Sequence, residues 1–134
     1  MVHYWKSGKQ KLVYDTASGA IIPLTSLEYK MIQAIQPPLS PLCPSSLRYE
    51  LAKFDSADVE EAYDHIYRLF KDGILFALEK EGQKHLRIGS PYGLTDPDEV
   101  ARDVVKILGG AMPKMILGEN ISKNRVDEIH QLFD

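Results

Sequence analysis

The first 24 residues hold short runs of β-forming residues that are separated by turn residues. The runs 3–7 and 10–15 flank a Gly-containing turn, which is typical of a hairpin. A second turn at 16–19 precedes the short apolar run 20–24, in which Pro23 cannot donate to a ladder. The pattern therefore predicts a three-stranded antiparallel meander whose third strand lies at the edge of the sheet.

From residue 25 the apolar positions change to a spacing of three and four residues, which predicts helices. We expect three helices, within 25–36, 45–54 and 55–72, with a Pro-rich loop before the second. Thr25 and Glu28 fit a capping box at the start of the first helix. The third helix has a long apolar stripe, which consists of Val59, Ala62, Tyr63, Ile66, Leu69 and Phe70.

Two further runs, 74–78 and 85–88, flank a polar link that contains glycine, and they predict a second hairpin. Three helices followed by a hairpin is the order of elements in a winged helix-turn-helix. Beyond the turn residues at 89–91, Asp96-Pro97 and its acidic neighbours favour a fourth helix, and 122–133 favours a last one.

The predicted fold class is therefore α+β. We expect a winged helix-turn-helix with an N-terminal three-stranded antiparallel meander, three helices and a wing hairpin, plus a small, mostly helical C-terminal extension. Residues 1–90 form the winged-helix domain in this interpretation, and residues 91–134 form an extension of unknown role. Of the twelve aromatic residues, ten precede residue 77, which favours an aromatic core in the first part of the chain.

Composition excludes several classes of function. The net charge is −3 and 44% of the residues are hydrophobic, so the sequence predicts neither a nucleic-acid nor a membrane partner. The single Cys43 excludes an internal disulfide and favours a reduced, cytoplasmic compartment. With no metal-ligand spacing among the histidines, no phosphate loop and no nucleophile elbow, we predict no catalytic residue, no metal and no cofactor.

A winged helix usually suggests DNA binding, but the charge of the third helix argues against it. Residues 56–72 carry five acidic side chains against Arg68 and Lys71, so this helix would place a net charge of −3 beside the phosphates. A DNA-binding regulator therefore stays an alternative, and a protein interaction or dimerisation domain is another.

The chain resembles the recognition element that binds precursor peptides in the biosynthesis of ribosomally made, modified peptides (RiPPs). The simplest member of this family is the peptide chaperone of pyrroloquinoline-quinone synthesis. The chain more closely resembles the N-terminal region of the thioether-forming radical S-adenosylmethionine (SPASM) maturases. The resemblance covers about residues 1–80, and it is carried by the segments 2–5, 12–15, 18–20, 59–62 and 69–76 and by Thr25 with Tyr29. The loop 37–44 is longer than in the family, and the Cys-x-x-x-Cys-x-x-Cys cluster motif of the full maturases is absent.

This resemblance implies a function without catalysis. A leader peptide would add as a strand between the third strand and the third helix and be presented to a radical S-adenosylmethionine maturase in cis or in trans. The residues implied in binding are Ala20, Ile21, Ile22, Leu24, Tyr63, Ile66, Tyr67 and Phe70. Since Ile21 and Ile22 point to opposite faces of a strand, we expect one in the core and the other toward the peptide.

Overall fold

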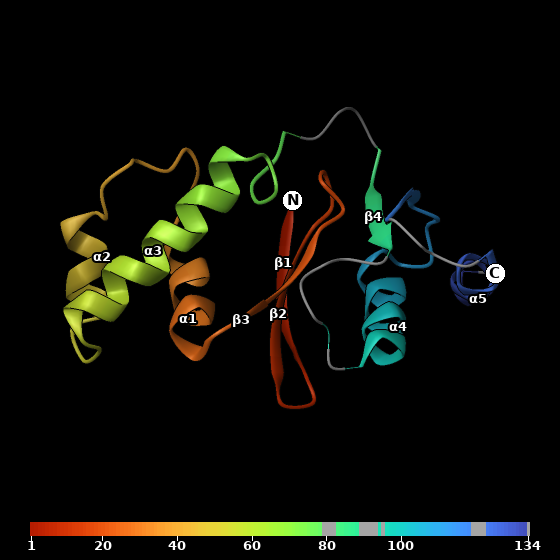
Figure 1. Cartoon of the computed structure of the whole chain (residues 1–134), viewed down its shortest axis with the longest axis horizontal. Helices are drawn as coiled ribbons and strands as arrows, with labels where there is room; N and C mark the ends of the chain where they lie inside the picture. The colour runs from red at the N-terminus through yellow and green to blue at the C-terminus, as the bar shows by residue number, and fades with distance from the viewer. Residues whose placement is uncertain (79–82, 89–93, 95, 119–122, 134) are drawn as a thin grey trace.

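The computed structural model describes residues 1–78, 83–88, 94, 96–118 and 123–133. In chain order its elements are β1 (Val2–Ser7), β2 (Gln10–Asp15), β3 (Ile21–Leu24), α1 (Ser26–Ala34), α2 (Ser45–Glu50), α3 (Ser56–Lys71), β4 (His85–Ile88), α4 (Pro97–Ile107), β5 (Lys114–Leu117) and α5 (Lys123–Leu132). The three N-terminal strands lie between α1, α2 and α3 on one side and β4, α4 and α5 on the other (Figure 1). The predicted α+β class is confirmed, whereas the winged helix is not.

The antiparallel meander has the strand order β1-β2-β3, as the sequence predicts. Gly8 and Lys9 form the two-residue turn between β1 and β2, and Ser7 faces Gln10 across the first pair of the ladder. Gly8 has a φ of +60°, which suits the first central position of a type II′ turn. Because β2 lies in the middle, β1 and β3 are the two outer strands.

One face of the sheet packs against the helices α1 and α3. Val13 and Ile22 from the strands are buried with Met31 of α1 and Ile66 of α3. The predicted capping box is confirmed at the start of α1, where both of its hydrogen bonds form. The cap marks the point at which the chain leaves β3 and begins α1.

The opposite face of the sheet is also buried. Leu12 and Tyr14 of β2 and Ile21 of β3 share a second core with apolar side chains of β4, α4 and α5, namely Leu86, Ile88, Val100, Val104, Leu108 and Ile129. In addition, Trp5 Nε1 donates to Asp103 Oδ2 over 2.9 Å. The second core thus joins segments on both sides of the predicted domain boundary, and the turn expected at 89–91 lies outside the described residues.

The predicted wing hairpin is wrong. Residues 74–78 form no strand, and β4 pairs in parallel with β5, a segment for which the sequence indicated no strand. The physical reason lies in the turn between β2 and β3, where Ser18 Oγ donates to Ile74 O (2.6 Å) and Ala77 N donates to Asp15 Oδ2 (2.9 Å). Backbone groups of 74–77 are therefore bound to the meander instead of to a partner strand.

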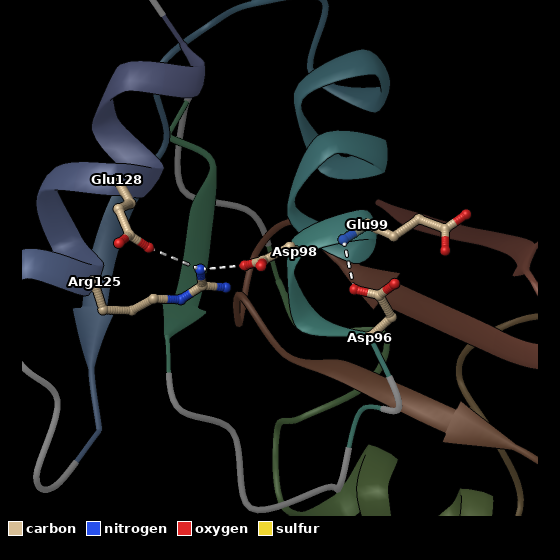
Figure 2. Close-up of polar contacts among 5 residues, drawn as sticks. All are labelled: Asp96, Asp98, Glu99, Arg125 and Glu128. Carbon is tan, nitrogen blue, oxygen red and sulfur yellow. Dashed lines mark hydrogen bonds and ion pairs between the residues drawn. The ribbon is translucent and has the colours of Figure 1, made fainter.

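The helices α4 and α5 are joined by charged side chains (Figure 2). Asp96 caps α4 by accepting from Glu99 N over 3.2 Å, which confirms the predicted start of this helix. From α5, Arg125 reaches Asp98 Oδ1 at 2.5 Å and Glu128 Oε2 at 3.4 Å. These contacts place α5 against the first turn of α4.

Candidate functional site: the two edges of the sheet

Hydrogen bonds in an antiparallel ladder alternate, and this alternation decides which backbone groups of an outer strand face outward. Asp15 N donates to Ala20 O over 3.0 Å. In the same phase, Ile22 and Leu24 of β3 bond to positions 13 and 11 of β2. Thr16 N donates to Met1 O over 2.9 Å, so the odd-numbered residues of β1 bond to the even-numbered residues of β2. The other residues of each outer strand direct their N–H and C=O groups away from β2.

The outward row of β3 is short. It consists of the N–H and C=O of Ile21 and the C=O of Pro23, since proline has no N–H. The proline nitrogen thus sits on the side without a neighbouring strand, where the ladder tolerates it. This edge therefore offers one donor and two acceptors to an added strand.

The four predicted site residues at β3 are all buried. Ala20, Ile21, Ile22 and Leu24 have exposed fractions of 0%, 4%, 1% and 8%. Ile22 belongs to the core beneath α1 and α3, and Ile21 belongs to the core beneath α4. The expectation that one of this pair faces a peptide is therefore wrong, because residues beyond 83 cover the second face of the sheet.

Two of the four predicted site residues on α3 are buried and two are half-buried. Ile66 lies in the core, and the Tyr63 hydroxyl donates to Ser40 O in the Pro-rich loop over 2.6 Å. Tyr67 stacks on Tyr63 with ring centroids 6.5 Å apart, and Phe70 lies 6.2 Å beyond it. The result is an aromatic row along one flank of α3.

This aromatic flank of α3 extends toward β1. Phe70 lines a cavity of about 920 Å³ together with Val2 at the start of β1 and the two prolines at 37 and 38. Where β3 continues into α1, the α3 residue in contact is His65, whose Nδ1 lies 2.5 Å from Glu28 Oε2. Phe70 thus borders the same cavity as Val2 of β1, whereas His65 of α3 contacts Glu28 of α1.

The outer edge of β1 is the feature that the sequence analysis missed. Val2, Tyr4 and Lys6 direct three N–H and three C=O groups away from β2, and none of these bonds to another backbone group within the described part of the chain. Tyr4 is 45% exposed, and its ring packs edge-on against Tyr29 of α1 at 5.9 Å. Lys6 Nζ lies 5.8 Å from the centre of the same Tyr29 ring. The signal in the sequence that could have indicated this edge was an aromatic residue and a lysine, Tyr4 and Lys6, in a strand at the edge of the sheet.

The cavity beside Val2 is mainly apolar and has a strained wall. Phe76 adopts a φ of +54°, a left-handed conformation that is costly for a bulky residue. The bond from Ala77 N to Asp15 Oδ2 holds the segment that carries it. Strained residues are concentrated at binding and active sites, so Phe76 supports this cavity as a candidate binding site.

The remaining surface gives little sign of other chemistry. The exposed acidic side chains of α3 are partly paired, since Glu60 forms an ion pair with Arg48 and Asp64 with Arg68. Within the described residues, no group of His, Cys, Asp and Glu side chains is arranged to hold a metal ion. No helix in the described ranges has the length and apolarity needed to span a bilayer.

Neither the known protein families nor the curated proteins compared with this chain give a match.

Proposed function

We propose that this protein binds an extended peptide by adding it as a fourth strand to the three-stranded sheet. The observation that carries the proposal is that both outer strands, β1 and β3, pair with β2 alone within the described residues. Outward N–H and C=O groups give an added strand its main-chain hydrogen bonds, and neighbouring side chains give specificity. We further propose, from the resemblance, that the peptide is the leader of a ribosomally made precursor and that a radical S-adenosylmethionine maturase receives it.

The resemblance assigns the receiving groove to β3 and α3. Support for this assignment is that β3 is an outer strand and that Tyr67 and Phe70 keep part of their rings accessible. The buried residues of the proposed set would then act by shaping the strand and the helix; they are Ala20, Ile21, Ile22, Leu24, Tyr63 and Ile66. Direct side-chain contact is left to the two half-buried rings.

No specific observation favours the two alternative functions. A recognition helix must bring cations to the phosphates, whereas Asp58, Glu60, Glu61 and Asp64 of α3 are exposed. The wing that would touch the DNA backbone is absent from the described residues, because β4 pairs with β5. An interaction or dimerisation domain would use the same outer strands, so these strands do not favour it over peptide binding.

The proposal is tested by titrating the full chain, in a calorimeter, with synthetic leaders of the precursor genes that adjoin its own gene. We expect binding with a Kd on the order of micromolar, which corresponds to about −8 kcal/mol. A leader of the same composition in scrambled order is the control. Amide hydrogen exchange should then show protection of outward N–H groups on one outer strand. Absence of binding by every adjoining leader contradicts the proposal, and salt-sensitive retention of DNA would favour the regulator.

A further inference from the structure

We propose that β1 is the edge that receives the peptide, and that it selects a segment with the pattern acidic–x–apolar–x–apolar, added antiparallel. This inference rests on the proposed peptide-binding function and names the edge and the chemistry of the peptide. It differs from the assignment to β3 that the resemblance implies.

The backbone groups of the two edges favour β1. At this edge Val2, Tyr4 and Lys6 each offer one donor and one acceptor, which is enough for three successive pairs of hydrogen bonds. At β3 only Ile21 offers both groups, because Pro23 removes the next donor. An added strand therefore gains at least twice as many main-chain bonds on β1.

The side chains along this edge define the pattern. Val2, Tyr4 and Lys6 lie on the same face of β1, and each stands directly opposite one residue of an added strand. Val2 borders the apolar cavity and Tyr4 packs on an aromatic ring, so both favour apolar partners. Lys6 favours an acidic partner. Since the pairs of this sheet are antiparallel, the peptide meets Lys6 first and the cavity last.

The charge of the segment that contains the meander favours an acidic partner. Residues 1–30 hold four lysines, and their two acidic side chains, Asp15 and Glu28, are buried. Asp15 accepts from Ala17 N and Ala77 N, and Glu28 accepts from Thr25 N and contacts His65. Their carboxylates are thus occupied within the fold, and the accessible formal charge of this segment is positive.

A second copy of the chain is a poorer occupant of the same edge. Antiparallel pairing of β1 with its copy about Tyr4 would put Lys6 of one chain opposite Val2 of the other, beside the apolar cavity. A lysine on an outer strand is also a known protection against pairing of identical edges.

The experiment begins with a displayed library of ten-residue random peptides, selected on the immobilised full chain. We expect enrichment of the pattern acidic–x–apolar–x–apolar. The affinity of a selected peptide is then measured by fluorescence anisotropy. N-methylation of its central apolar residue, which faces Tyr4, should weaken binding by about tenfold or more, whereas N-methylation of either x position should leave it unchanged, because those amides point away from β1.

Variants of the protein locate the edge. Tyr4→Pro removes an outward donor and leaves the ladder to β2 intact, so it should bind about tenfold more weakly than the matched Tyr4→Ala. Lys6→Glu should bind more weakly than Lys6→Gln. Pro23→Ala adds an outward donor to β3 and should leave the affinity for the peptide unchanged. Thermal melts check the fold of each variant, and the Lys6 pair carries the test if Tyr4→Pro fails to fold.

Different outcomes separate this inference from the proposed function. Tighter binding by Pro23→Ala, with no effect of the variants at Tyr4 and Lys6, assigns the peptide to β3 and overturns the inference while peptide binding stands. A basic consensus in the selected peptides overturns the acidic pattern. Failure of both the library and the adjoining leaders to bind overturns the inference and the proposed function together.

Discussion

At the scale of single residues, Gly19 controls how closely β4 approaches the meander. Its φ is +80°, and a Cβ at this position would lie 2.9 Å from Arg87 N, which donates to Gly19 O. We predict that Gly19→Ala lowers the free energy of unfolding by about 2–5 kcal/mol, because left-handed strain adds to displacement of β4. Gly8→Ala is the matched control, since its φ is +60° and its surroundings are open. It should cost about 1–2 kcal/mol, and equal losses in urea denaturation would contradict the role of β4.

The single thiol of the chain is buried, and we expect burial to lower its reactivity. The Cys43 side chain is buried, and this desolvation raises the pKa of the thiol, with Arg48 opposing the shift and Glu60 adding to it. A raised pKa means less thiolate at neutral pH. We predict that iodoacetamide at pH 7.5 alkylates the folded chain at least about tenfold more slowly than the chain in urea, and that the folded rate rises with pH. Mass spectrometry measures both rates, and equal rates would show that the thiol is accessible.

At the scale of elements, a tyrosine hydroxyl connects β2 to β4. The Tyr14 hydroxyl donates to His85 O over 2.5 Å, and we predict that Tyr14→Phe costs about 1–3 kcal/mol because this acceptor loses its partner. Burial, and then the charge of Asp15, raise the pKa of Tyr14 well above its ordinary value. The neutral phenol therefore stabilises the fold fully below about pH 10, where an unfolded tyrosine ionises, and progressively less above it.

The pH dependence gives this prediction its control. Above about pH 10 the unfolded wild-type chain gains an ionisation at position 14 that the Tyr14→Phe chain lacks. The difference in unfolding free energy between the two chains should therefore shrink as the pH rises from 9 to 11. Urea titrations across this range measure it, and a constant difference would mean that Tyr14 ionises as readily in the folded chain as in the unfolded one.

Elements whose signals are local follow from the sequence, and those that depend on distant partners do not. The capping box at Thr25, the helix start at Asp55 and the edge position of Pro23 are all confirmed, since each depends on residues close in the chain. The wing hairpin failed because side chains of Asp15 and Ser18 bind the segment 74–77. The pattern of apolar and polar residues in 74–77 could not predict those hydrogen bonds.

The candidate site shows the same limit. Helical periodicity correctly groups Tyr63, Tyr67 and Phe70 on one flank of α3, but it does not tell which strand that flank approaches. The Pro-rich loop accepts the Tyr63 hydroxyl, and Phe70 faces the cavity beside Val2. The residues of the aromatic row could therefore be predicted, whereas the cavity that Phe70 shares with Val2 of β1 could not.

At the scale of the whole molecule, the sheet is buried on both faces. The aromatic residues are concentrated in the first part of the chain, which favoured a core there. Yet the second core is built largely from aliphatic residues after 85, which cover Leu12, Tyr14 and Ile21. Because one sheet supplies side chains to both cores, we expect the two halves of the chain to unfold together.

Truncation tests this coupling. A chain that ends at residue 90 keeps α1–α3 and β4. It loses four buried side chains of the second core, each of which contributes about 1.5–3 kcal/mol, namely Val100, Val104, Leu108 and Ile129. The total approaches the 5–15 kcal/mol that typically separates a folded from an unfolded domain. We predict that this fragment loses its cooperative urea transition, followed by far-UV circular dichroism and Trp5 fluorescence, and that it binds a hydrophobic dye.

The control for this truncation is a chain that ends at residue 118, which lacks α5 and the residues on either side of it but keeps β4, α4 and β5. It removes Ile129, the buried residue of that helix, and should lose about 1.5–3 kcal/mol while keeping a single transition. A fragment 1–90 that unfolds as sharply, and at the same urea concentration, as the full chain would show an independent first domain, as the sequence alone predicts. In that case the second core would contribute nothing to the first, and the free edges of the sheet could be studied on the fragment.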